Sequence, residues 1–245
     1  MTILETLARQ ATREWQQTNH FSFGKVSYKR ESAGVRFSFM STVSGIDVSD
    51  WQDPCPMDSL KPTNFMFVYA KVTEGTDYIS TTYLQKQKDA LAAGLMFGGY
   101  HFFDWSQDPT AQAEAFIANV SMERGNLPPA LDCEGDTAGL TPDQCVAAMA
   151  TWLQVVGDAF GRFPVVYMSP SFWSTSLAST DGFTGHPLWV ADYNALPNAP
   201  SLGSWQPMIW QYTSQGSVDG ISGGVDFNEY QGTLAQLQAL GYKHH

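Results

Sequence analysis

The pattern of apolar and polar positions along the chain changes character near residue 44. Residues 3–17 place apolar side chains three and four positions apart, the spacing of one face of an amphipathic helix. Residues 21–39 follow with two runs in which apolar and polar positions alternate, and these predict a β-hairpin. Beyond them, short apolar runs alternate with longer runs of helical spacing. The pattern therefore predicts a small helix-plus-hairpin extension over residues 1–43 and a larger domain over residues 44–245.

The predicted elements of the larger domain follow one another in the order of a β/α barrel. Two of its helices should begin at good capping pairs, Asp108-Pro109 and Thr141-Pro142. After residue 167 the intervals between strands are rich in Pro, Ser and Gly, so full helices are not expected there. We therefore predict a mixed α/β fold, an irregular TIM-like barrel. Its predicted strands are 45–48, 65–72, 96–103, 130–134, 165–168, 188–193, 208–212 and 225–227, and its predicted helices are 82–93, 110–124 and 142–160.

The composition is that of a large, acidic chain. With 245 residues, a barrel of one domain can bury a large core without disulfides. The net charge is -11, although residues 1–43 hold six basic and three acidic residues, a net +3 that leaves -14 for the rest. Duplex nucleic acid is bound through a basic surface that neutralises phosphates, so no nucleic-acid partner is expected. No apolar run reaches transmembrane length, and the N-terminus lacks the apolar stretch of a signal peptide.

The cysteines and glycines carry no recognisable cofactor motif. Cys55, Cys133 and Cys145 form neither a disulfide framework nor a metal-ligand spacing, and we expect them to be small buried hydrophobes. The glycine pairs at 98–99 and 223–224 match neither a phosphate-binding loop nor a dinucleotide fingerprint. The sequence therefore predicts no nucleotide cofactor and no catalytic metal.

Five acidic residues lie at or near the ends of predicted strands. Asp132 and Glu134 are two positions apart, so they face the same side of one strand. Asp47, Asp192 and Asp226 lie on or after three other strands, and chemistry in β/α barrels collects at the C-terminal strand ends. Two close carboxyl groups repel each other's charge, so one stays protonated and can act as a general acid. Glycoside cleavage requires that arrangement.

Further residues on the same strands are candidates for contact with a substrate, through stacking on sugar rings or through hydrogen bonds. These candidates are Tyr100, Phe103, Tyr167, Trp189, Asp192, Tyr193 and Gln211. His101 lies one position from Tyr100, so it should face the opposite way, into the core. Lys71 and Glu74 are expected to form an ion pair near the end of the second strand.

Seven segments resemble the family-25 glycoside hydrolases, the Chalaropsis-type lysozymes that hydrolyse the bond after N-acetylmuramic acid. They occur in the order found in that family and span about residues 44–232. The segments are GIDVSDWQ at 45–52, VYAKVTEG at 68–75, GGYHFF at 98–103, ALDCE at 130–134, PLWVADY at 187–193, IWQYT at 209–213 and VDFN at 225–228.

The resemblance implies a (β/α)5(β)3 barrel that hydrolyses the β-1,4 bond between N-acetylmuramic acid and N-acetylglucosamine in bacterial peptidoglycan. It implies that Glu134 is the general acid and base. Asp132 would stabilise the substrate's acetamido group or the positive charge that develops. Asp47 and Asp226 match acids that line the family's catalytic pocket.

Two other functions remain open. A chitinase-like hydrolase of another acetamido sugar would typically carry a D-x-x-D-x-D-x-E run, and residues 127–134 lack its first acids. A non-catalytic glycan-binding or virion structural module would be indicated by loss of the acids, which are present here.

Residues 1–43 have no counterpart in the basic family domain. They are expected either to pack on the barrel or mediate self-association, or to dock the enzyme onto a wall or a phage particle. We expect a phage-type endolysin, made in the cytoplasm without a signal peptide and acting on the bacterial cell wall. A secreted bacterial autolysin is the alternative.

Overall fold

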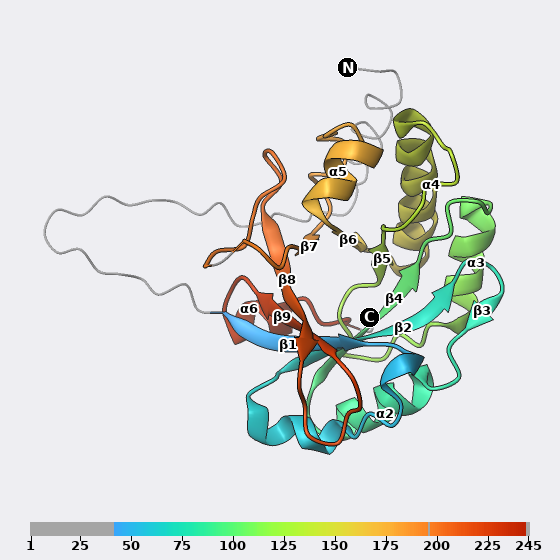
Figure 1. The fold of residues 1–245 in the computed structure, drawn as a ribbon. Helices are drawn as coiled ribbons and strands as arrows, with labels where there is room; N and C mark the ends of the chain where they lie inside the picture. The colour runs from blue at the N-terminus through green and yellow to red at the C-terminus, as the bar shows by residue number, and fades with distance from the viewer. Residues whose placement is uncertain (1–41, 196, 244–245) are drawn as a thin grey trace, which may run out of the picture.

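The structure, a computed structural model, describes residues 42–195 and 197–243. The predicted N-terminal helix and hairpin therefore lie outside the described residues. Within them, eight strands close into a barrel with helices around it (Figure 1). No helix of this part of the chain is long and apolar enough to cross a membrane.

The strands form one sheet with the order β1-β9-β8-β7-β6-β5-β4-β2-β3, and the barrel closes because β1 also pairs with β2. Neighbouring barrel strands are parallel except at β9, which is antiparallel to both β8 and β1. The short β3 lies antiparallel to β2, outside the barrel. The strands are β1 (Val43–Val48), β2 (Phe67–Glu74), β3 (Tyr78–Ile79), β4 (Met96–Phe102), β5 (Ala130–Asp132), β6 (Val165–Met168), β7 (Leu188–Ala191), β8 (Pro207–Gly216) and β9 (Val225–Tyr230).

Helical segments follow the first five barrel strands, and among the described residues none follows β7 or β8. This order agrees with the (β/α)5(β)3 barrel that the resemblance implies. Helices α3 and α4 pack side by side, on the opposite side of the barrel from β1, β8 and β9 (Figure 1). The segments are η1 (Asp50–Gln52), η2 (Met57–Thr63), α2 (Tyr83–Ala92), α3 (Pro109–Asn119), α4 (Pro142–Phe160), α5 (Pro170–Ser176) and α6 (Leu234–Ala239).

Most predicted elements are confirmed, but some boundaries were wrong. Helix α4 and strand β6 have the predicted bounds, and both predicted capping residues accept a backbone hydrogen bond. The helix predicted over 110–124 ends at Asn119 instead, because Val120 adopts an extended conformation. The two short helices α5 and α6 were not predicted, since neither is long enough to show a helical period.

Large rings fill the inside of the barrel, and glycines on adjacent strands make room for them. Phe67 and Tyr69 point inward from β2 and are fully buried. Gly45 of β1 is the register partner of Phe67, and Gly98 of β4 is the partner of Tyr69. A Cβ atom at either glycine would lie within 2.5 Å of its partner's ring, closer than real contacts allow. Ring and glycine are therefore matched in size across the strand pairs.

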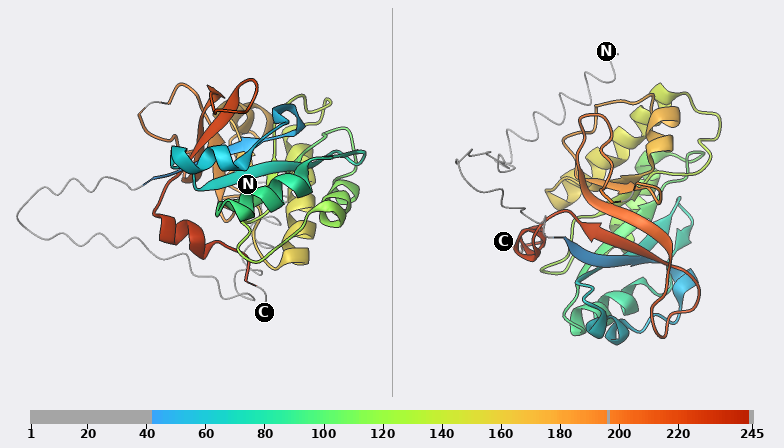
Figure 2. Two further views of the ribbon diagram at one scale, coloured as in Figure 1. Left: turned by 90° about the horizontal axis from the view of Figure 1, so that it is seen from below. Right: turned by 60° about the vertical axis from the view of Figure 1, so that its left-hand side comes forward.

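Helix α6 closes the end of the barrel opposite the strand ends that carry the acids. Leu237 of this helix is fully buried and belongs to the same cluster as Phe67 and Val165, which begin β2 and β6. Arg162 donates a hydrogen bond to the carbonyl of Leu240, just after the helix. In both views of Figure 2, α6 lies apart from α3 and α4. Helix α6 thus covers this end of the barrel and shields its interior from solvent.

We expect Gly98→Ala to lower the free energy of unfolding by about 1–3 kcal/mol, because overpacking a full core forces neighbours to move. The Tyr69 ring is fully buried, with its centre 4.9 Å from the centre of the Trp189 ring, so it cannot move away from an added methyl group. Gly157→Ala is the matched control: its Cβ would lie 3.5 Å from the Arg162 carbonyl, and alanine favours helix α4 by roughly 0.5–1 kcal/mol. Urea denaturation measures both, and equal stabilities would contradict the tight fit.

Candidate active site

A cavity of about 270 Å³ lies at the end of the barrel where the parallel strands finish. Each of the eight barrel strands contributes an inward-facing residue to it, and Glu134 and Tyr193 are added just beyond β5 and β7. The lining residues are Asp47, Lys71, Tyr100, Phe102, Asp132, Glu134, Tyr167, Trp189, Tyr193, Gln211 and Asp226. Four carboxyl groups and one ammonium group therefore share a small space with aromatic walls.

The β5 segment brings Asp132 and Glu134 to the cavity by simple alternation. Asp132 is the last residue of the strand, and Cys133 turns outward into the core between barrel and helices, where it is fully buried. The indole N–H of Trp105 donates to the Glu134 carbonyl at 2.9 Å and so holds the backbone at Glu134 in place. The Asp132 Oδ1 atom is buried without a hydrogen-bond partner among the described residues.

The two carboxyl groups of this pair hold protons more tightly than free ones. Burial raises the pKa of Asp132 well above its usual value, and the nearby charge of Glu134 raises it further. Burial also raises the pKa of Glu134, although its side chain stays open to solvent through the cavity. The ammonium group of Lys71 lowers both values. We interpret the pair as sharing one proton over a range of pH.

Lys71 is the one cation among the residues that line the cavity. Its ammonium group contacts Glu74 Oε2 at 2.7 Å, which confirms the predicted ion pair, and it lies 4.5 Å from the centre of the Phe102 ring. Sequence reasoning assigned this lysine to a structural pair alone. Its inward position two residues after Tyr69 could have placed it in the cavity.

Asp47 and Asp226 form a second acidic pair across the β1–β9 register, where they are direct partners. Burial and then the charge of Asp226 raise the pKa of Asp47 well above its usual value. Burial, and then the charge of Glu134, raise the pKa of Asp226 to about 6, although a hydrogen bond from Asp47 lowers it in part. These pKa shifts indicate that Asp47 is protonated and donates a hydrogen bond to the Asp226 carboxylate.

Gln211 connects Asp47 with two tyrosines. Its Nε2 donates to Asp47 Oδ2 at 2.8 Å, and its Oε1 accepts from the hydroxyl groups of Tyr167 at 2.9 Å and Tyr193 at 2.7 Å. Since Gln211 is 2% exposed and both polar ends are occupied, its clearest role is to hold Asp47 in place. The predicted direct hydrogen bond from Gln211 to a substrate stays a prediction.

Asn228 supplies the second amide to Asp47 and was missed from the sequence. Its Nδ2 donates to Asp47 Oδ2 at 2.8 Å, and its own Oδ1 accepts from the Trp189 indole at 2.8 Å. Asn228 is fully buried two residues after Asp226, so strand alternation could have placed it on the same face. Together the two amides satisfy one oxygen of a carboxyl group that would otherwise be buried unpaired.

The structure brings nine of the predicted site residues to the cavity, but not Phe103 or Asp192. Phe103 is 1% exposed and packs against Trp105 with ring centres 4.7 Å apart. Because Tyr100 faces inward, a residue three positions later on the same strand run must face outward, and Phe102 occupies the cavity wall instead. Contact between Phe103 and a substrate is therefore not expected.

Asp192 and His101 both have local roles. The Asp192 carboxylate accepts from the Asn194 amide at 2.9 Å, and its carbonyl accepts from the Trp210 indole at 2.9 Å, so this residue shapes the turn after β7. His101 is fully buried and stacks on Trp152 with ring centres 5.5 Å apart. The prediction that His101 faces the core is confirmed.

Carboxyl pairs and aromatic walls at the strand ends of a β/α barrel are the arrangement of a glycoside hydrolase. The sequence profile described as Glycosyl hydrolases family 25 matches residues 46–221. The chain is 35% identical over 215 residues to Lysozyme M1 of Streptomyces globisporus, covering 82% of this chain and 71% of that protein. It is 32% identical over 205 residues to N,O-diacetylmuramidase of Chalaropsis sp, covering 76% and 96%.

The fold gives the same result. The crystal structure of the bacterial lysozyme from Streptomyces coelicolor is similar with a TM-score of 0.76 and 33% identity, covering 82% of this chain and 98% of that one. The chain belongs to glycosyl hydrolases family 25. The resemblance seen in the seven sequence segments is thereby confirmed.

We expect Asp226→Asn to raise the free energy of unfolding by about 1–2 kcal/mol at pH 7, a value reduced for solvent screening. A carboxyl group whose pKa rises on folding destabilises the folded state at pH values above that pKa. The gain should shrink as pH falls from 7 toward 4, since wild-type Asp226 then becomes protonated in both states. Urea denaturation across this range measures it.

The exposed Asp219→Asn, which removes the same charge, is the control and should change stability little. A difference between Asp226→Asn and wild type that is independent of pH would show that the raised pKa is not its cause.

Proposed function

We propose that the protein is a lysozyme that hydrolyses the β-1,4 bond between N-acetylmuramic acid and N-acetylglucosamine in bacterial peptidoglycan. The observation that carries the proposal is the convergence of Asp47, Asp132, Glu134 and Asp226 on one cavity of a family-25 barrel. The named relatives, a lysozyme and an N,O-diacetylmuramidase, support the same substrate class.

Glu134 is proposed as the general acid and base. Of the Asp132–Glu134 pair it is the more exposed group, so it can reach the oxygen of a glycosidic bond in the cavity. The proton that it shares with Asp132 passes from Glu134 to the leaving oxygen as the bond to the sugar breaks. The resulting carboxylate then accepts a proton from the water that completes hydrolysis.

Asp132 is proposed to act on the sugar ring itself. Asp132 lines the cavity, so its carboxyl group can accept a hydrogen bond from the N–H of the substrate's acetamido group. An N–H that donates to Asp132 favours its charged form, so the proton that the pair shares then lies on Glu134. The Asp132 carboxylate also stabilises the positive charge that develops as the bond breaks. The Asp226 carboxylate, held by Asp47, adds to that negative potential.

The aromatic residues of the cavity form two groups, one buried and one exposed to solvent. Tyr100, Tyr167 and Trp189 are at most 9% exposed, so they form the cavity wall rather than open stacking surfaces. Burial raises the pKa of Tyr100 and of Tyr167 well above the usual value, which keeps both hydroxyl groups as neutral donors. Tyr193 is 47% exposed, and we propose that it stacks on a sugar or a peptide stem.

Two narrower hypotheses go with this function and stay predictions. One is that the enzyme acts as a phage-type endolysin, with a secreted autolysin as the alternative. The other is that residues 1–43 dock it on a wall or particle or mediate self-association.

We expect Glu134→Gln to lower the rate of peptidoglycan hydrolysis by about 10²–10⁴-fold, the usual contribution of general acid–base catalysis. Mass spectrometry of the fragments from purified peptidoglycan should show new reducing ends on muramic acid with the wild type and none with the variant. Glu114→Gln, an exposed change on α3 with the same chemistry, should leave the rate unchanged.

Each other outcome has a definite meaning. Reducing ends on glucosamine would keep the hydrolase but change the bond that it cleaves. Failure of the wild type to release fragments from several wall types, while still binding them, would favour a non-catalytic glycan-binding module.

A further inference from the structure

An exposed tryptophan lies just beyond the end of β1. The Trp51 side chain is 87% exposed, the most of any large hydrophobic residue in the described part of the chain. An indole of this size left in water forgoes the free energy of burial that most tryptophans gain in a fold. Single exposed hydrophobic residues are common, but Trp51 is distinguished by the way its turn is held and by where it lies.

The turn that carries Trp51 is fixed from both ends. Ser49 and Gln52 form a capping box, in which the Ser49 amide donates to Gln52 Oε1 at 2.9 Å and the Trp51 amide donates to Ser49 Oγ at 3.3 Å. Gln52 Nε2 also donates to the Gly224 carbonyl at 3.3 Å, which ties the turn to the segment before β9. The backbone under the indole is therefore anchored to two strands.

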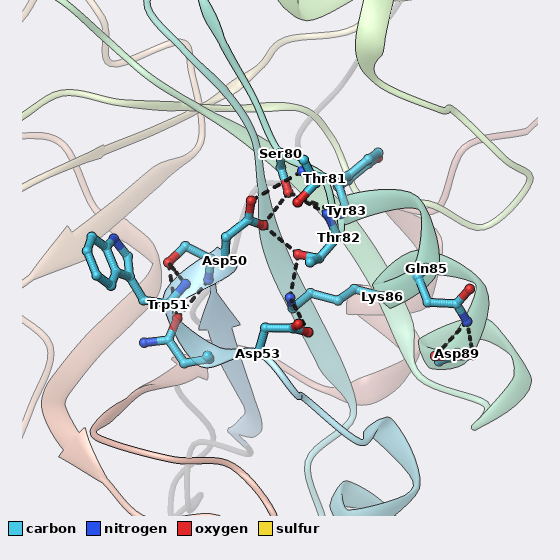
Figure 3. A network of polar contacts seen from close by, with 12 residues as sticks. Asp50, Trp51, Asp53, Ser80, Thr81, Thr82, Tyr83, Gln85, Lys86 and Asp89 are labelled. Atoms are coloured by element: carbon cyan, nitrogen blue, oxygen red, sulfur yellow. Dashed lines mark hydrogen bonds and ion pairs between the residues drawn. The ribbon is translucent and has the colours of Figure 1, made fainter.

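Asp50 anchors the same turn on its other side (Figure 3). Its carboxylate accepts hydrogen bonds from the hydroxyl groups of Ser80 at 2.5 Å, Thr82 at 2.5 Å and Tyr78 at 2.7 Å, and from the Thr81 amide at 3.2 Å. Burial raises the pKa of Asp50, but these hydrogen bonds outweigh it and lower the pKa to about 2. The anchor is thus a charged group throughout the physiological range.

Trp51 lies at the same end of the barrel as the catalytic cavity. It follows Asp47 by four residues, and Gly224, to which its turn is bonded, precedes Asp226 by two. Figure 3 shows the indole on the side of the turn away from Lys86 and the other α2 residues. The turn that carries Trp51 is therefore linked to both strands of the second acidic pair, to β1 through the chain and to the segment before β9 through a hydrogen bond.

A smaller apolar surface lies next to this turn, on β3. Tyr78 is 40% exposed and Ile79 is 50% exposed. The Tyr78 ring lies 5.9 Å from the Lys71 ammonium group of the cavity, while its hydroxyl contacts Asp50. Tyr78 thus bridges the Trp51 turn and the cavity wall.

We propose that Trp51 is a stacking platform for a sugar ring of the glycan strand outside the catalytic cavity, a subsite that rests on the proposed function. A cavity of about 270 Å³ is smaller than the roughly 300–1,000 Å³ of sites for small ligands, so most of a polymer must lie on the rim. The apolar C–H face of a pyranose can stack on the exposed indole, and the anchored backbone beneath the indole needs no ordering on binding.

The first test measures hydrolysis of glycan oligosaccharides of increasing length by wild type, Trp51→Ala and Trp51→Phe. We expect Trp51→Ala to raise KM on long strands roughly 10-fold, with an unchanged kcat on the shortest oligosaccharide that is cleaved. Trp51→Phe keeps a ring and should restore most of the loss. Leu84→Ala, which removes an exposed apolar side chain 63% exposed on α2, is the control and should not change KM.

The second test is titration calorimetry of the same oligosaccharides with Glu134→Gln, alone and combined with Trp51→Ala. An affinity that rises with length only when Trp51 is present supports the platform. Equal KM and equal affinity at every length would overturn it, while wild-type cleavage would still uphold the proposed function. If the wild type cleaves nothing, calorimetry alone decides: Trp51-dependent affinity supports the subsite, and its absence overturns it.

Discussion

Mutual repulsion of four carboxyl groups in one small cavity is the constraint on which this structure depends. Burial makes each charge unfavourable, so the fold must supply partners. It does so with two amides on Asp47, a proton between Asp47 and Asp226, and the single ammonium group of Lys71. These groups come from β1, β2, β8 and β9, so the register of those strands and the chemistry of the site cannot vary independently.

Much of this arrangement could be predicted because the side chains of a strand alternate between two faces. Asp132 and Glu134 were placed together on that ground, and the same rule put His101 in the core. The long helix α4 was predicted with its bounds, and its capping residue Thr141 was recognised in the sequence. The structure shows that Gly161, in the αL conformation, ends the helix. Long periods and strong caps are local properties, so a sequence displays them directly.

The remainder depends on contacts between distant segments. Phe103 was predicted to contact the substrate, but Phe102 lines the cavity instead, because it lies two positions after the inward-facing Tyr100. The part that Asn228 plays appears only when β9 lies beside β1, 181 residues away in sequence. Strand alternation places Asn228 on the same face as Asp226, but no local feature of the sequence shows that it orients Asp47.

Closure of the barrel joins the first and the last of its strands, and this has a consequence for biosynthesis. Asp47 emerges early from the ribosome, whereas its partners Asp226 and Asn228 emerge 179 and 181 residues later. A nascent chain therefore contains only scattered acids, and the complete set exists once synthesis has passed β9. Such long-range pairing also slows folding, so the acidic site is complete only after the last barrel strand has paired with the first.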